Sequence, residues 1–349
     1  MNSATRFSTS TRAQLMPVLA ALGLLATTAA GAAPVYKCQR LDSEKLSDSQ
    51  AGAINDRNVV VGWAYDGVAK WSKKADRLLA RCTDEVAAVP SGINNDGIAV
   101  GTVEVAPFPT HKQAVRWSAD GSCHVLDQLT ANNAYANGIN NLGEVAGNLD
   151  SEVGVWSATG VWHALPTPSG AVYPDAIAIN DSGTVVGKAF AANGPGTLAI
   201  RWKDGRAKRL DSLPGMSEDV TVPRAINDGG QIVGHSGWNA VTWLNGKVYA
   251  LPGDGAEGSS AVGVNRAGQI IGFLSYSKPV YWSSYTAAPI ALADLMDDGG
   301  CTGPNGEIAT VTELAAINNH GVIAATGEWK DSSGSTVNSA FSLQPVAAQ

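Results

Sequence analysis

The sequence predicts an all-β fold: a seven-bladed β-propeller of four-stranded blades, with the ring closed by the N-terminal strand. Three observations support this. A short motif recurs seven times, the spacing of its copies suits one blade, and 39 glycines lie among runs rich in Val, Ile and Thr. Short β-branched runs separated by glycine-rich turns are typical of all-β proteins. An internal repeat of this length indicates one domain built from neighbouring units.

The motif has the form Ile-Asn-x-x-Gly-x-Val-Val-Gly, with small variations between copies. The repeats start near residues 54, 93, 139, 179, 226, 264 and 317, at spacings of 39, 46, 40, 47, 38 and 53 residues. A four-stranded propeller blade needs roughly 40 to 45 residues, a rung of a parallel β-helix far fewer, and an immunoglobulin-like unit about twice as many. Seven units therefore fit one closed ring.

An asparagine is the second residue of every copy: Asn55, Asn94, Asn140, Asn180, Asn227, Asn265 and Asn318. Three residues later six copies have glycine and the first has Asn58, the residue that best tolerates a positive φ after glycine. This position is predicted to be left-handed, in the turn of a hairpin. The asparagines could form a ring of ligands, but side chains that cap their own turns are the preferred interpretation.

The rest of each unit supplies three more strands. A short apolar run such as Val60-Val61-Gly62 predicts a buried second strand. A third apolar stretch ends in tryptophan in six units, and a fourth strand ends near a leucine. One repeat position for so many tryptophans favours packing between neighbouring units over separate binding roles. These residues are Trp71, Trp117, Trp156, Trp202, Trp243 and Trp282.

The seventh unit lacks a fourth strand, and an unassigned segment precedes the first unit. Its Arg40-Leu41-Asp42-Ser43 repeats Arg209-Leu210-Asp211-Ser212 from the end of the fourth unit. We therefore expect residues 35 to 42 to complete the last blade, which removes the open sheet edges that invite aggregation. Residues 344 to 349 are expected to be a tail beyond the last strand.

Residues 1 to 32 are predicted to be a signal peptide. Arg6 and Arg12 precede the apolar run 15 to 30, and Ala30-Gly31-Ala32 ends it. An uncleaved anchor is the alternative; no membrane span is expected after cleavage, because no second run of spanning length follows. Residues 33 to 349 form the predicted single propeller domain, secreted or periplasmic and monomeric. Cleavage moves the formal charge from −7 to −9. Because the acidic chain also lacks a large Lys/Arg cluster to neutralise phosphates, nucleic acid is excluded as a partner.

Four cysteines in an oxidising compartment predict two disulfides. Cys38 belongs to the strand that completes blade seven, and Cys301 to the loop that enters the same blade. Cys82 belongs to the outer strand of blade one, and Cys123 to that of blade two. Because bridged Cα atoms lie within about 7 Å, only the pairs Cys38-Cys301 and Cys82-Cys123 keep both bridges local.

The repeat resembles that of the HAF-repeat family of extracellular bacterial proteins, over roughly residues 50 to 343. Asn180-Asp181-Ser182-Gly183 with Val185-Val186-Gly187 matches the first half of that repeat, and Ser339-Ala340-Phe341 resembles the His-Ala-Phe motif of its name. No unit keeps His-Ala-Phe intact, so the chain would be a divergent member. The resemblance implies an exported repeat protein and supplies no catalytic residues.

The sequence contains no G-x-S-x-G elbow, H-E-x-x-H helix, P-loop or dinucleotide motif. Asp294, Asp297, Asp298 and Glu307 surround a glycine-rich insertion and could hold calcium, but an acidic surface loop is preferred. No metal, cofactor or catalytic residue is assigned. We expect a non-catalytic binding or scaffold module for an unknown extracellular ligand, glycan or protein. The alternative is a hydrolase or lyase with a site assembled from several blades.

The loops after each second strand and between units should share one face, and loops on a rigid scaffold commonly carry function. The residue after the second-strand glycine enters this face. This position gives four candidate binding residues, Trp63, Lys188, His235 and Phe273, and the adjoining loops add Phe108 and Trp238. An enzyme should show a cluster of ionisable groups at one mouth of the channel, and a binding module only polar and aromatic residues.

Overall fold

We describe a computed structural model of the chain over residues 33–41, 48–73, 76–82, 85–106, 111–126, 133–215, 220–253, 258–297 and 299–346. The predicted signal peptide and Phe108 lie outside these residues. Residues 33 to 349 form one compact unit. In the described part of the chain, no helix is both long enough and apolar enough to cross a membrane.

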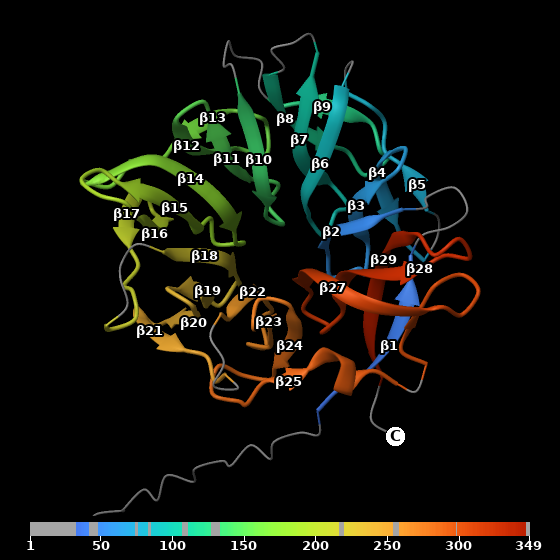
Figure 1. The fold of residues 1–349 in the computed structure, drawn as a ribbon. Helices are drawn as coiled ribbons and strands as arrows, with labels where there is room; N and C mark the ends of the chain where they lie inside the picture. Colours follow the sequence, from blue (N-terminus) through green and yellow to red (C-terminus); the bar gives the residue numbers. More distant parts are fainter. Residues whose placement is uncertain are drawn as a thin grey trace, which may run out of the picture. The chain divides into compact units, whose positions relative to one another are not determined.

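Seven antiparallel sheets stand around a central channel, which confirms the predicted seven-bladed propeller (Figure 1). In blades one to six the strands follow chain order from the channel outward. The first three blades contain β2 (Gln50–Ile54), β3 (Val60–Ala64), β4 (Gly67–Trp71) and β5 (Arg77–Leu78); β6 (Glu85–Ile93), β7 (Ala99–Val105), β8 (His111–Trp117) and β9 (Cys123–Val125); β10 (Ala134–Ile139), β11 (Val145–Leu149), β12 (Glu152–Trp156) and β13 (Trp162–Ala164).

Blades four to six repeat the same order. They contain β14 (Ala171–Ile179), β15 (Val185–Ala191), β16 (Thr197–Lys203) and β17 (Arg206–Arg209); β18 (Thr221–Ile226), β19 (Ile232–Ser236), β20 (Asn239–Leu244) and β21 (Lys247–Ala250); β22 (Ser260–Val264), β23 (Ile270–Leu274), β24 (Lys278–Trp282) and β25 (Ile290–Ala291). A short 3₁₀ helix, η1 (Leu292–Leu295), follows β25.

Blade seven is closed by the N-terminal strand, as predicted. Its sheet has the order β1 (Val35–Arg40), β29 (Thr336–Val346), β28 (Ile323–Lys330), β27 (Ile308–Ile317) and β26 (Cys301–Thr302). The expectation that residues 344 to 349 form a tail is wrong for residues 344 to 346. They extend β29 and pair with the start of β1, with Val346 opposite Val35. The partner strand stabilises this extension, because β1 supplies ladder partners beyond Leu343.

The asparagine of each repeat caps its own turn, as predicted, and also joins neighbouring blades. In all seven copies the side-chain oxygen accepts the backbone N–H four residues later, at 2.9 to 3.0 Å. Asn58 has a φ of 57°, which confirms the left-handed turn. The side-chain amides donate around the ring from one asparagine to the backbone oxygen of the next, at 2.8 to 3.3 Å, in the order 55, 94, 140, 180, 227, 265, 318 and back to 55.

The tryptophans pack between blades, as predicted, and all six are at least 97% buried. In four units the indole N–H donates to the carbonyl that follows the outer strand of the preceding blade, at 2.7 to 3.0 Å: Trp117 to Ala80, Trp202 to Pro166, Trp243 to Asp211 and Trp282 to Pro252. The second-strand glycines make room for this packing. A Cβ on Gly62 would lie 1.9 Å from the Gln50 carbonyl oxygen and 2.9 Å from Trp71.

Both predicted disulfides are present in the structure. Cys38 and Cys301 have Cα atoms 5.1 Å apart and link β1 to β26 within blade seven. Cys82 and Cys123 have Cα atoms 4.9 Å apart and join the outer parts of blades one and two. The first bridge therefore fixes the strand that closes the ring.

Candidate functional site

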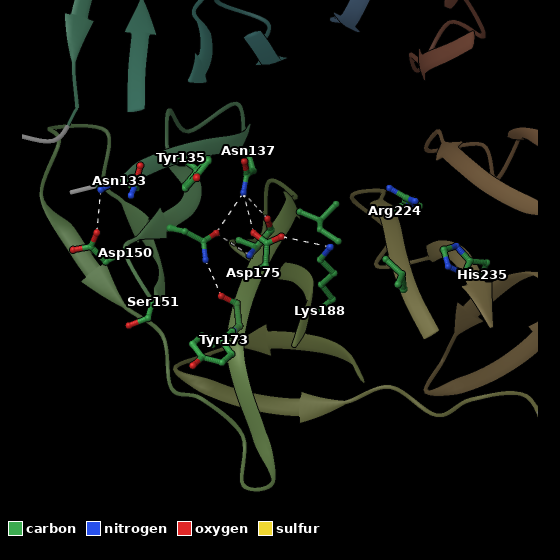
Figure 2. Close-up of a pocket in the computed structure, with 15 residues that line it drawn as sticks. Asn133, Tyr135, Asn137, Asp150, Ser151, Tyr173, Asp175, Lys188, Arg224 and His235 are labelled. Carbon is green, nitrogen blue, oxygen red and sulfur yellow. Dashed lines mark hydrogen bonds and ion pairs between the residues drawn. The ribbon is translucent and has the colours of Figure 1, made fainter. Parts of the chain in front are cut away.

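A polar cavity of about 910 Å³ lies at the channel end opposite the asparagine turns. It is formed by the two innermost strands of blades three, four and five, near the starts of the first strands and the ends of the second strands (Figure 2). Its lining includes Asn133, Tyr135, Asn137, Asn148, Asp150, Ser151, Tyr173, Asp175, Ile177, Lys188, Val222, Arg224 and His235. The cavity wall thus combines polar and charged side chains with tyrosine rings and apolar residues.

A β-bulge in each first strand contributes side chains to this end of the channel. Two positions before the motif isoleucine or valine, the pairing register skips one residue in all seven first strands, and in blades three to five this residue is Asn137, Ile177 and Arg224 in turn. A bulge leaves its extra residue outside the ladder and re-aims its side chain. Asn137 donates to the backbone oxygen of Ala176 in blade four at 2.7 Å, so it bridges the two blades at the cavity wall.

Asp175 and Lys188 form an ion pair in the cavity wall, with 3.9 Å between Oδ2 and Nζ. The two residues face each other across β14 and β15. Burial raises the pKa of Asp175 above its ordinary value, and the neighbouring Lys188 charge opposes the rise. The Asp175 carboxylate also faces the Asn137 amide at 3.4 Å. This carboxyl group is therefore more easily protonated than an exposed aspartate.

Arg224 and His235 form the opposite side of the cavity, on β18 and β19 (Figure 2). Burial and the nearby Arg224 charge lower the pKa of His235 to about 4, so the imidazole is neutral near pH 7. Its Nδ1 is buried and has no hydrogen-bond partner among the residues that the structure describes. Arg224 is exposed, and within the described ranges its guanidinium makes no ion pair.

Of the six predicted binding residues, the structure brings Lys188 and His235 into the cavity. Four of the six occupy one register position, opposite the first strand: Trp63 pairs with Gln50, Lys188 with Asp175, His235 with Val222 and Phe273 with Ser260. They share one end of the blades, but Trp63 and Phe273 lie in blades one and six, away from the cavity. Phe273 packs against a hydrophobic cluster. Trp238 lies in the turn after β19 and is exposed.

Several cavity residues were not predicted from the sequence, among them Tyr135, Asn137, Tyr173, Asp175 and Arg224. The repeat alignment contained a signal for two of them. Two positions before the motif isoleucine, the units have Gly52, Ser91, Asn137, Ile177, Arg224, Val262 and Ala315, so a long polar side chain is unusual there. Asp175 can be recognised as a cavity residue only from the strand register, which places it opposite Lys188.

The other mouth of the channel holds a smaller hollow of about 170 Å³ between the seven turns. Its polar groups bond one another: the backbone N–H of Asn141 reaches Asp181, and that of Asn319 reaches Asp56. Burial alone would raise the pKa of Asp56, but hydrogen bonds from Asn95 and Asn319 outweigh it and lower the pKa. These contacts tie the turns together, so we place the candidate site in the larger cavity.

No protein-family model matches the chain, and no curated protein matches it in sequence. Among solved structures, one similar fold is the extracellular domain of a protein assigned to the hybrid two component systems of B. thetaiotaomicron. It has a TM-score of 0.52 and 7% identity over 90% of this chain and 40% of that one. A second, assigned to the one component systems of the same organism, has a TM-score of 0.51 and 7% identity over 88% and 39%.

A gluconolactonase from Xanthomonas campestris is also similar, with a TM-score of 0.43 and 11% identity over 90% of this chain and 99% of that one. The present chain spans about two fifths of the B. thetaiotaomicron chains. At 7% identity, the similarity to the two B. thetaiotaomicron domains shows the propeller fold alone, because unrelated functions share this fold.

Proposed function

We propose that the chain is an exported binding propeller, which takes a hydroxyl-rich ligand carrying an anionic group in the cavity of blades three to five. One observation carries the proposal: two cationic side chains from neighbouring blades, Lys188 and Arg224, line one cavity together with asparagine and tyrosine side chains. Sites of this kind combine a few fixed polar groups with aromatic surface. The planar guanidinium of Arg224 suits bidentate contact with a carboxylate.

Rigidity of the cavity wall supports a binding role. Asn148 is buried and donates to the Pro174 carbonyl at 2.8 Å, and its side-chain oxygen accepts the Ala176 N–H at 3.2 Å. Lys112 lies 5.3 Å from the centre of the Tyr135 ring. These contacts hold polar side chains in place before a ligand arrives, which lowers the entropic cost of binding.

An extracytoplasmic location, monomeric state and divergent membership of the HAF-repeat family belong to the same proposal. Two disulfides are typical of proteins outside the reducing cytoplasm. The repeat motif and the predicted signal peptide support export, and the acidic charge argues against nucleic acid as a partner.

An array of acidic and neutral saccharides tests the binding role. We expect residues 33 to 349 to bind acidic saccharides, and Arg224→Ala to weaken that binding about tenfold or more, as expected when an arginine that contacts a ligand is truncated. The matched control is Arg206→Ala on the outer strand β17 of blade four, where the side chain is also exposed. Equal binding by the Arg224→Ala and Arg206→Ala proteins, or no binding to any acidic saccharide, would contradict the proposal.

One observation favours the alternative of a hydrolase or lyase. Asp175 and His235 line the same cavity, and their pKa values are shifted in opposite directions. Such pairs can divide the roles of general acid and general base. Incubation with the bound saccharides separates the two functions: hydrolysis releases reducing ends, and elimination creates an absorbing double bond. A binding propeller produces neither. Product formation that is lost in His235→Asn would establish the enzyme instead.

A further inference from the structure

Two exposed aromatic residues contact each other beside the cavity. Trp238 lies in the turn between β19 and β20, and Tyr276 in the turn between β23 and β24 of the next blade. Their ring centres are 6.1 Å apart in an edge-to-face arrangement, although the residues are 59% and 66% exposed. Aromatic side chains of this size are normally covered when they lie at a blade interface, because they bury large apolar areas.

The backbone holds this pair in place at an energetic cost. Ser275 and Tyr276 have φ values of 48° and 64°, a left-handed conformation that is uncommon for bulky residues. The Tyr276 ring lies against Gly258: an added Cβ there would be 2.2 Å from Tyr276 Cε2. The Tyr276 N–H also donates to the Gly258 carbonyl at 2.9 Å. A strained turn that presents an exposed ring in a fixed position points to a binding role.

The pair lies at the same end of the blades as the cavity. His235 lines the cavity, and Trp238 follows it by three residues, so the two Cα atoms are at most about 10 Å apart. The turn between them is fixed by Gly237, which donates to the Val220 carbonyl at 2.9 Å. On the far side of the cavity, Tyr173 repeats the same features, with a φ of 51° and 69% exposure. Tyr173 thus belongs to the cavity lining, and the Trp238–Tyr276 pair lies in the turns of blades five and six, beyond His235.

We propose that Trp238 and Tyr276 form a stacking subsite for a pyranose ring, and that the ligand is an acidic oligosaccharide extending from the cavity to this pair. The inference rests on the proposed function. A sugar ring presents an apolar face to an aromatic ring and hydroxyl groups to the Asn and Asp side chains of the cavity. A lipid would need a larger continuous apolar surface, and a nucleic acid more basic residues.

Calorimetric titration with hexamers of galacturonate, mannuronate and guluronate, and with their monomers, tests the inference. We expect at least one hexamer to bind more tightly than its monomer. Trp238→Ala and Tyr276→Ala should each weaken the hexamer about tenfold, the loss typical of a truncated aromatic contact, and leave the monomer unchanged. The matched control is Tyr65→Ala in the β3–β4 turn of blade one, where the side chain is 74% exposed.

The outcomes separate this inference from the proposed function. The stacking subsite alone is overturned if the monomer binds in a way that depends on Arg224 but the hexamer binds no more tightly than the monomer. The same holds if hexamer binding is unaffected by Trp238→Ala and Tyr276→Ala. Absence of binding to all three acidic sugars overturns both. An equal loss in Tyr65→Ala would show that the effect does not come from the pair and would also overturn the subsite.

Discussion

One asparagine in each repeat performs two tasks that the sequence pattern could not separate. Its oxygen caps the turn of its own blade, and its amide donates to the next blade. The first task was predictable because asparagine beside a left-handed glycine is a known turn signal. The second depends on the ring geometry, which places each turn beside the same turn of the next unit.

Asn180→Ala should therefore destabilise the whole domain. Asn180 is buried, accepts the Thr184 N–H at 2.9 Å and donates to the Asn227 carbonyl at 3.0 Å. Leaving these buried partners unsatisfied costs about 2 to 4 kcal/mol. Urea unfolding monitored by circular dichroism measures the change, with the exposed Asn193→Ala as control. A cost equal to that of the control would show that the ring adds no stability.

His235 should make stability depend on pH. Because burial and Arg224 lower the folded pKa of His235 to about 4, the unfolded state binds more protons between about pH 6.5 and pH 4. The His235 contribution is complete above pH 6.5 and is lost as the pH falls to 4. We expect a loss on the order of 1 kcal/mol, because partial exposure screens the shift.

The comparison of native protein with His235→Asn isolates this effect. Asp175 acts in the opposite direction, since its raised pKa favours the folded state at low pH, and it is present in both proteins. The difference between the urea midpoints at pH 7 and pH 4 should be larger for the native protein than for the His235→Asn variant. The same pH dependence in both proteins would contradict the assignment.

At the scale of strands, the blade pattern was predictable and the cavity largely was not. Pairs of valines and the tryptophans at strand ends indicate buried positions. Strands such as β3 and β16 can therefore be predicted from their own sequence. The closing strand followed from the Arg-Leu-Asp-Ser repeat. Asp175 and Arg224 join His235 only through register and bulges. These are properties of strand pairs, and a single strand's sequence does not determine them.

Deletion of residues 35 to 40 should prevent stable closure of blade seven. Tyr36 on β1 is fully buried, and loss of a buried aromatic side chain alone costs about 3 to 5 kcal/mol. Removal of residues 347 to 349 should leave the melting temperature unchanged. The deletion is made with Cys301→Ser and compared with Cys38→Ser/Cys301→Ser, so that the disulfide is absent from both. Equal melting temperatures for that pair would refute closure by β1.

The two disulfides should contribute unequally to the stability of the folded chain. Cys38–Cys301 spans 263 residues and Cys82–Cys123 spans 41. Chain-entropy arguments give about 5.5 and about 4 kcal/mol, so removing the first should cost about 1.5 kcal/mol more. The paired serine variants, Cys38→Ser/Cys301→Ser and Cys82→Ser/Cys123→Ser, are compared by urea unfolding. A larger loss from the second pair would contradict the ranking.

The ring of asparagine amides has a consequence for how many blades such a chain can have. Each link joins the same atom types in adjacent copies of one motif, always in the same direction around the channel. A duplicated unit inserted at any junction would find the donor and acceptor that it needs without a change in its neighbours. The number of blades is therefore set by a different feature, the angle between adjacent blades at the interfaces filled by tryptophan.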